Sequence, residues 1–170
     1  MTDQQGLSVE LTRILAQFTL SEVMSKHLLT VYEGWSIKRL SQFFLKHDIS
    51  GAPVIAADDE LVGVVTQSDI IRFESVDPDK QQIIKLVRQY SGPFGGPIDE
   101  AEVRRIQTHA KDYCTVNSIM TNKVISIDIN SSLEKAYLLI LGTQVQRIFI
   151  TQQGLLVGVL TAMDILRIIA

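Results

Sequence analysis

Two short stretches of the chain each place a hydroxyl and a carboxylate three residues apart. They are Thr66 with Asp69, and Thr161 with Asp164. A run of β-branched residues precedes each Thr and apolar residues at helical spacing follow each Asp, so both pairs are predicted at strand-to-helix junctions. The first turn of a helix has free backbone N–H groups that favour an anion. Such a corner could hold a phosphate beside the hydroxyl and a vicinal ribose diol on the carboxylate.

A second interpretation of the same residues needs no ligand. A Thr followed three residues later by an acid is also a capping box, in which the two side chains satisfy donors of the helix itself. The sequence leaves both interpretations open at each corner.

Other chemistry finds little support in the sequence. The single cysteine, Cys114, cannot form an internal disulfide, and no Cys/His cluster has metal-ligand spacing. His27, His47 and His109 occur singly, without a paired nucleophile, and are predicted at the surface, whereas Cys114 is predicted to be a buried structural thiol. With no Walker loop either, the sequence predicts a protein that is not an enzyme, requires no cofactor and holds no metal.

The two corners belong to an internal repeat. Residues 61–72 read LVGVVTQSDIIR and residues 156–167 read LVGVLTAMDILR, with eight identities in twelve positions. Upstream the match continues at a spacing of 96, which pairs Thr19 with Thr115, Met24 with Met120 and Ser36 with Ser132. The spacing changes by one residue within a turn, where an insertion costs little.

Each repeat predicts the same elements in the same order. A short extended segment (28–31; 124–127) precedes a helix capped by Ser36 or Ser132. A hairpin (53–56 with 61–66 in the first repeat) and a final helix starting near Asp69 or Asp164 follow. The unit is β-α-β-β-α, and the fold class is α/β (α+β).

The segments outside the repeats are predicted to be helical. Residues 1–18 form an N-terminal helical segment, 19–73 the first repeat, 74–113 an insert and 114–170 the second repeat. Within the insert, Asp77 and Pro78 open one helix, the SGPFGGP elbow at 91–97 breaks it, and Asp99 with Glu102 caps a second helix running toward Asp112.

The repeated pattern resembles the CBS domain family. The resemblance rests on L-V-G-V-x-T-x-x-D-I-x-R, on I-S-G-A-P-V at 49–54, and on V-M or I-M before the first strand, and it covers about two thirds of the chain. It implies two repeats in a pseudo-twofold pair with a helical insert between them. It also implies two clefts between the repeats, of the kind that bind AMP, ADP, ATP or S-adenosylmethionine in many members.

The resemblance implies two unequal clefts. The stronger one would have a cation, because Arg147 matches an arginine that points at phosphate in nucleotide-binding members, and a guanidinium makes charge-assisted bonds to phosphate. An exposed or acid-paired surface arginine is the alternative for Arg147, and cap or turn roles are the alternatives for Thr19 and Ser50. The residues of this cleft are Thr19, Met24, Ile49, Ser50, Arg147, Thr161 and Asp164.

The weaker cleft has Gly51 where the other repeat has Arg147, so it lacks the cation, although Ser68 adds a hydroxyl. Its residues are Thr66, Ser68, Asp69, Thr115, Met120, Val145 and Gln146.

Composition excludes several partners. A net charge of −3 and a pI near 5.6 argue against nucleic acid. No apolar run approaches the roughly 20 residues that span a bilayer. Asp3 and Glu10 stand where a signal peptide would be basic and then apolar, so a cytoplasmic location is expected.

Assembly is predicted from helix 132–141, which is apolar around most of its circumference and needs a second partner. We expect this helix and helix 165–170 to pack against symmetry mates in a homodimer, the alternative being cover by inserted helices at 78–112. The functional expectation is a regulatory, energy-sensing module that binds an adenosine-type ligand and signals to an unknown effector protein in trans. The alternative is an interaction scaffold with vestigial clefts.

Overall fold

The structure is a computed structural model that describes residues 9–75, 83–84, 88, 96 and 99–170. The chain forms two compact units. Unit 1 comprises Met1–Leu29, Asp59–Leu61 and Val124–Ala170, and unit 2 comprises Thr30–Asp58 and Val62–Lys123. Each unit contains the sheet of one repeat.

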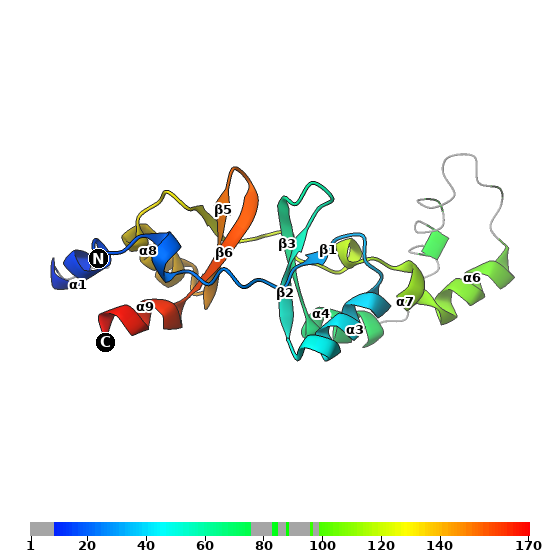
Figure 1. Ribbon diagram of the computed structural model, residues 1–170. Coiled ribbons are helices and arrows are strands. Elements are labelled where there is room, and N and C mark those ends of the chain that lie inside the picture. The colour runs from blue at the N-terminus through cyan, green and yellow to red at the C-terminus, as the bar shows by residue number, and fades with distance from the viewer. Residues whose placement is uncertain (1–8, 76–82, 85–87, 89–95, 97–98) are drawn as a thin grey trace, which may run out of the picture. The chain divides into compact units, whose positions relative to one another are not determined.

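Unit 1 contains a three-stranded sheet in the order β4-β5-β6, formed by β4 (Ser126–Asp128), β5 (Arg147–Gln152) and β6 (Leu155–Thr161). Strand β4 runs parallel to β5, and β5 runs antiparallel to β6. The helices of this unit are α1 (Val9–Leu15), α2 (Leu20–Val23), α8 (Leu133–Thr143) and α9 (Ala162–Ile169). Helix α1 packs against α8 and α9, and α2 packs against β6 (Figure 1).

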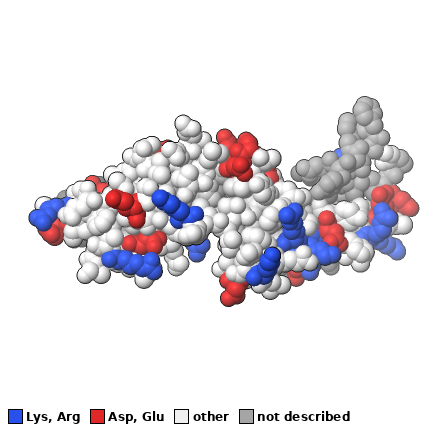
Figure 2. All heavy atoms as spheres, in the orientation of Figure 1, with Lys and Arg blue, Asp and Glu red and all other residues white. Residues whose placement is uncertain are grey.

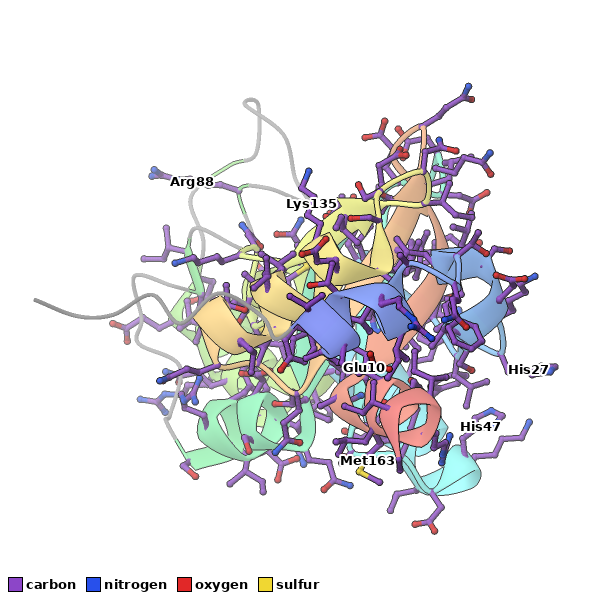
Figure 3. All side chains as sticks on the ribbon, turned by 90° about the vertical axis from the view of Figure 1, so that its left-hand side faces the viewer. Glu10, His27, His47, Arg88, Lys135 and Met163 are labelled. Atoms are coloured by element: carbon purple, nitrogen blue, oxygen red, sulfur yellow. The ribbon has the colours of Figure 1, made fainter. Side chains whose placement is uncertain are left out.

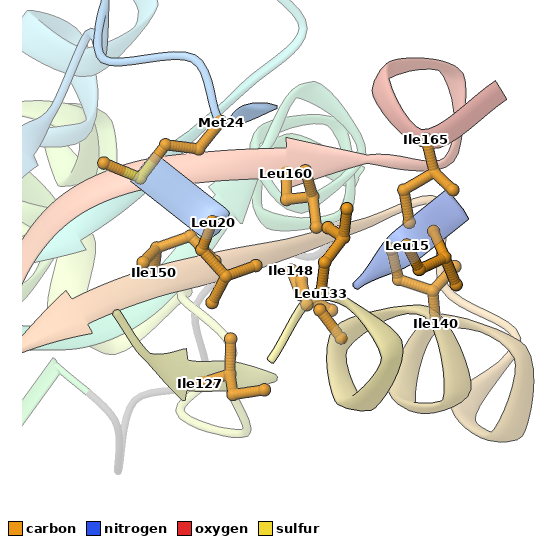
Figure 4. Close-up of a cluster of buried hydrophobic side chains, with 11 residues drawn as sticks. Leu15, Leu20, Met24, Ile127, Leu133, Ile140, Ile148, Ile150, Leu160 and Ile165 are labelled. Carbon is orange, nitrogen blue, oxygen red and sulfur yellow. The ribbon is translucent and has the colours of Figure 1, made fainter. Parts of the chain in front are cut away.

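The core of unit 1 combines residues from both ends of the chain. Leu15 and Leu20 are completely buried among Leu133, Ile148 and Leu160 (Figure 4). The N-terminal helices are therefore part of the hydrophobic core of the second repeat, and their burial stabilises it.

Unit 2 contains the matching sheet in the order β1-β2-β3, formed by β1 (Val31–Tyr32), β2 (Gly51–Ile55) and β3 (Leu61–Thr66). Strand β1 runs parallel to β2. The helical elements of this unit are α3 (Ile37–His47), α4 (Gln67–Ser75), α6 (Glu100–Thr108), α7 (Ala110–Tyr113) and the 3-10 turn η1 (Val116–Ser118). Ala110, Cys114 and Val116 join the core formed by α3 and the sheet.

Several predicted elements are confirmed. The stripe Ile37, Leu40 and Phe44 is buried on α3, and Leu133, Ala136 and Ile140 are buried on α8. Ser36 and Ser132 cap these helices, each side-chain oxygen accepting a backbone N–H three residues on at 3.2 Å.

Other boundaries differ from the prediction. The final helices begin at Gln67 and Ala162, two residues before the predicted Asp69 and Asp164, because the Thr is the last residue before the helix and the Asp lies in its first turn. The first strands begin later than predicted, at Val31 and Ser126.

The insert is only partly described. The predicted helix opening at Asp77 and Pro78 and most of the SGPFGGP elbow lie outside the described residues. Asp99 caps α6 as predicted, accepting the Ala101 N–H at 3.4 Å. Glu102 takes no part in that cap among the described contacts, since it pairs with Arg105, and the helix breaks at His109 before α7.

The segments that precede the first strands are exchanged between the repeats. Ser25, from the first repeat, exchanges two backbone hydrogen bonds with Val159 on β6 of the second, at 2.9 and 3.0 Å. Thr121, from the second repeat, exchanges the equivalent pair with Val64 on β3 of the first, at 2.9 and 3.0 Å. Each unit is therefore built from one repeat and the leading segment of the other.

Within the described residues, no helix combines the length and apolar character that crossing a bilayer would require.

Candidate functional site

The corner of unit 1 lies at the junction of β6 and α9. The Thr161 backbone N–H and hydroxyl both donate to Asp164 Oδ2, at 2.9 and 2.7 Å. The Asp164 N–H donates back to Thr161 Oγ1 at 3.2 Å. This is the reciprocal capping box, so the interpretation that needs no ligand describes real contacts at this corner.

The second carboxylate oxygen of Asp164 faces an arginine. Arg167 Nη1 donates to Asp164 Oδ1 at 3.2 Å. The Asp164 side chain is 16% exposed and that of Arg167 is 74% exposed. The carboxylate is thus held mainly by the Thr161 bonds, and its remaining oxygen contacts an exposed cation.

The corner of unit 2 repeats this arrangement. The Thr66 N–H and hydroxyl donate to Asp69 Oδ2 at 2.8 and 2.9 Å, and Arg72 Nη1 donates to Asp69 Oδ1 at 3.3 Å. Asp69 is 8% exposed. The motif T-x-x-D-x-x-R therefore specifies the same threonine and arginine contacts to the carboxylate in both repeats.

Arg147 lies beside the unit 1 corner. It begins β5 and is the register partner of Thr161, the last residue of β6. The arginine is exposed. No hydrogen bond or ion pair engages its guanidinium within the described part of the chain. Among the described residues Arg147 is therefore the exposed surface arginine of the alternative and not an acid-paired one, and its role toward a phosphate stays a prediction.

Gly51 occupies the equivalent position in unit 2. A Cβ atom added there would lie 3.3 Å from Thr66 Cγ2 and 3.3 Å from the Val65 carbonyl oxygen. This tight approach of β2 to β3 leaves little space for a side chain. The two corners thus share their Thr, Asp and Arg contacts but differ in the neighbouring cation.

Thr19, assigned to the stronger cleft, forms a cap of its own in unit 1. Its backbone N–H and hydroxyl donate to Glu22 Oε2 at 2.7 and 2.8 Å. These bonds lower the pKa of the Glu22 carboxyl, the backbone bond contributing most. The cap role for Thr19 is therefore observed. In the second repeat, Ser118 replaces the acid and donates to the Thr115 carbonyl at 2.6 Å.

The glycine of V-G-V is a residue whose role the sequence prediction missed. A Cβ on Gly158 would overlap Met24 Sδ, and a Cβ on Gly63 would lie 2.8 Å from Met120 Sδ. Each glycine makes room for the methionine of the exchanged leading segment. The signal was available in the sequence, because V-G-V and the V-M or I-M pair both occur twice.

Each of the remaining predicted site residues lies in the unit that contains the sheet of its own repeat. Ile49 and Ser50 lie beside the corner of their own repeat in unit 2, where the Ser50 carbonyl accepts the Gln67 N–H at 2.9 Å. Val145 and Gln146 lie beside the corner of unit 1, where the Gln146 carbonyl accepts the Ala162 N–H at 3.0 Å. The grouping of these pairs with the opposite corners stays a prediction.

Ser68 differs from its counterpart in the other repeat. It is exposed in the first turn of α4, and Met163 holds the equivalent place on α9, 58% exposed (Figure 3). The unit 2 corner therefore has a hydroxyl where the unit 1 corner has a thioether.

Other reactive side chains behave as predicted. All three histidines are exposed, and His27 and His47 point away from the ribbon (Figure 3). Cys114 is buried, and burial raises the pKa of its thiol. Among the described residues, no three His, Cys, Asp or Glu side chains gather in a way that could hold a metal ion.

Charge on the described surface is mixed. Figure 2 shows acidic and basic side chains interspersed on the visible face, with no continuous basic area over its described residues.

Known proteins resemble this chain over most of its length. The protein MJ1426 of Methanocaldococcus jannaschii is 25% identical over 158 residues, covering 86% of this chain and 88% of that protein. CBSX2 of Arabidopsis thaliana, a CBS domain-containing chloroplast protein, is 24% identical over 153 residues, covering 88% of this chain and 63% of that protein. A match to the homoserine O-acetyltransferase of Methanohalobium evestigatum covers 56% of this chain and 19% of that enzyme.

Solved structures share the fold. The CBS domain of a membrane protein from Sphaerobacter thermophilus aligns with a TM-score of 0.64 at 23% identity, covering 94% of this chain and 92% of that chain. CBSX2 in complex with AMP aligns with a TM-score of 0.59 at 21% identity, covering 88% and 94%. The CBS domain pair of MJ0100, in complex with 5-methylthioadenosine and S-adenosyl-L-methionine, aligns with a TM-score of 0.55 at 18% identity, covering 89% and 95%.

The family described as CBS domain matches residues 20–76 and 116–170, which are the two repeats found in the sequence. The duplicated corners, the two matching sheets and this match over most of the chain lead to one conclusion: the chain belongs to the CBS domain family.

Proposed function

We propose that this protein is a non-enzymatic regulatory module that binds an adenosine-type ligand at its duplicated corners and signals to a partner protein in trans. The corner of Thr161 and Asp164 takes the ribose, and Arg147 takes a phosphate. The expected ligands are AMP, ADP, ATP and S-adenosylmethionine, and the module acts in the cytoplasm.

The observation that carries this proposal is the pairing of Arg147 with the Thr161 corner. Asp164 Oδ1 accepts only the exposed Arg167 among the described contacts, and the Arg147 guanidinium, one strand away from Thr161, has no ion-pair partner among the described residues. Carboxylate and guanidinium at adjacent strand ends match the donors of a ribose and the charge of a phosphate. The CBSX2 complex with AMP and the MJ0100 complex with S-adenosylmethionine support an adenosyl ligand.

Signalling requires that the ligand prefer one conformation of the module. A ligand shifts an equilibrium only by its difference in affinity for the two states. We propose that occupancy of the corners changes how the repeats are held, and that a partner protein, acting in trans, binds one arrangement more tightly.

We further propose a homodimer through α8 and α9. Leu138 and Leu141 on α8 are 50% and 56% exposed, and Met163 and Leu166 on α9 are 58% and 48% exposed. These exposed apolar side chains on unit 1 support a second copy as the partner of α8 and α9.

A thermal-shift screen with AMP, ADP, ATP, NAD and S-adenosylmethionine tests the proposal. A ligand at 100 times its dissociation constant should stabilise the protein by about 2.7 kcal/mol. We expect a rise in melting temperature with at least one adenosyl ligand, and its loss in Asp164→Ala.

Arg147→Gln separates the phosphate site from the ribose site. Removing the guanidinium should weaken AMP binding about tenfold or more and leave adenosine binding within about twofold, because a charge-assisted bond to phosphate contributes about 1.5–3 kcal/mol. Calorimetric titration of both ligands measures the difference. Equal losses for AMP and adenosine would assign Arg147 to folding.

A scaffold with vestigial corners is the second candidate. It is favoured by the threonine bonds, which occupy one oxygen of each carboxylate without any ligand. A screen with no ligand-induced shift, in the unmodified protein and in Asp164→Ala alike, would select it. Turnover of a nucleotide that disappears in the same variant would instead indicate an enzyme.

A further inference from the structure

The carboxylates at the two corners have few free acceptor positions. A carboxylate offers about four lone-pair positions, two on each oxygen. Asp164 Oδ2 already accepts the Thr161 N–H and hydroxyl, so both of its positions are occupied. Asp164 Oδ1 accepts Arg167, which leaves one position open. The same accounting holds for Asp69 with Thr66 and Arg72.

A ribose offers more donors than this single position can take. Its vicinal diol carries two O–H groups, and a carboxylate that binds both must accept two hydrogen bonds. One donor already present at the corner must therefore leave before both hydroxyls can bind.

The geometry decides which donor is displaced. The two Thr161 bonds are 2.7 and 2.9 Å long and come from the residue that ends the strand, whereas the arginine bond is 3.2 Å and comes from a single Nη1. Arg167 is 74% exposed, so water can solvate its guanidinium when it moves away. The pair joins residues three apart on a helix, and its arginine is exposed although its carboxylate is largely buried, so moving the arginine into water costs less than breaking the two Thr161 bonds.

We propose that Arg167 and Arg72 act as displaceable plugs that compete with a ribose diol for the carboxylates of Asp164 and Asp69. The arginine occupies the ribose position when no ligand is bound, and the diol replaces it. These arginines thereby set the affinity for ligands with an intact ribose. This inference rests on the proposed function and adds a specificity-determining residue to each corner.

The experiment compares adenosine with 3′-deoxyadenosine on the full chain carrying Arg167→Ala or Arg72→Ala. Neither nucleoside has a phosphate, so loss of a positive charge does not weaken binding through charge. We expect at least one variant to bind adenosine about two- to fivefold more tightly than the unmodified protein, in line with the strength of an exposed ion pair. The gain should be absent for 3′-deoxyadenosine, whose single remaining hydroxyl at this edge of the sugar fits the position already free.

Two variants serve as controls. Arg167→Lys keeps a cation within reach of Asp164 and should bind adenosine as the unmodified protein does. Arg105→Ala removes the exposed partner of Glu102, an ion pair of the same i,i+3 spacing on α6 with no threonine corner, and should change neither nucleoside's affinity. Thermal unfolding of each variant shows whether a change in affinity follows a change in stability.

Tighter binding of both nucleosides to the same degree, or weaker binding of adenosine by both alanine variants, would overturn the inference. Failure of the proposed function looks different. If the unmodified protein binds no adenosyl ligand, the double variant Arg72→Ala/Arg167→Ala decides: new binding of adenosine supports the plugs, and continued absence of binding rejects both ideas.

Discussion

At the scale of single residues, the threonine and aspartate of each corner bond to each other at the start of a helix, and this contact needs no ligand. Thr161 donates twice to Asp164, and Thr66 donates twice to Asp69. The capping role is therefore established at both corners. A ligand can use only the acceptor positions of the carboxylate that the threonine bonds leave open. The arginine three residues later contacts that same remaining oxygen in both repeats.

Glu22 gives a pH-dependent test of a third cap. The Thr19 N–H and hydroxyl lower the pKa of this carboxyl in the folded protein. Its contribution to stability is therefore present above the ordinary pKa of about 4.3 and is lost as the pH falls through the lower folded value. We expect Glu22→Gln to lower the urea midpoint at pH 7 and to match the unmodified protein in strong acid.

Thr19→Val is the matched control for this test. It removes the hydroxyl donor but keeps the backbone N–H, which is the larger cause of the lowered pKa. Most of the pH dependence should survive in this variant. If Glu22→Gln lowered the urea midpoint by the same amount at pH 7 and in strong acid, the result would contradict the assignment of this pH dependence to the Glu22 carboxylate.

At the scale of elements, the pairing of a glycine with a methionine explains two motifs at once. Gly158 on β6 receives Met24, and Gly63 on β3 receives Met120. The surroundings differ in one respect. All three atoms nearest a Cβ on Gly158 belong to Met24, whereas a Cβ on Gly63 would also lie 2.9 Å from the Thr121 carbonyl oxygen.

This difference predicts the outcome of a double-mutant cycle. Gly158→Ala and Gly63→Ala should each destabilise the protein by about 1–3 kcal/mol through overpacking. Adding Met24→Ala should recover part of the loss at Gly158, because the three atoms nearest the new methyl group all belong to that side chain. Adding Met120→Ala should recover less at Gly63, where a backbone carbonyl remains. Urea unfolding measures both couplings, and equal recovery at the two glycines would contradict the prediction.

Sequence patterns were reliable for elements whose signal is local. The helical stripes on α3 and α8 and their serine caps follow from spacing alone. The two final helices begin two residues before the Asp that the pattern predicts as their start, because the capping partner Thr is the last residue before the helix. The break at His109 between α6 and α7 had no clear sequence signal.

At the scale of the whole molecule, each compact unit combines one repeat with the leading segment of the other. Because of this exchange, removal of residues 1–29 would take Leu15, Leu20 and Met24 out of the core of the second repeat and would expose the rest of that core. The two repeats are therefore not independent folding units.

The proposed dimer is tested by charge on α8. The double variant Leu138→Glu/Leu141→Glu places two carboxylates on the exposed apolar side chains, and we expect it to be monomeric by light scattering after size exclusion. Gln42→Glu, at the position of α3 equivalent to Leu138, adds a charge outside the proposed interface and should leave the dimer intact. An unmodified protein that is itself monomeric at micromolar concentration would reject the interface.

The sequence by itself determined the repeats, the β-α-β-β-α order and the four residues of the corners, because these depend on local spacing, caps and β-branched runs. Only the tertiary structure decided that the leading segments exchange, that Gly158 and Gly63 receive methionines, and that Arg167 and Arg72 occupy the carboxylates. The first two features are contacts between residues distant in the chain. The third depends on which donors occupy the oxygens of one carboxylate. Periodicity and composition do not encode which partner a side chain finds once the chain has folded.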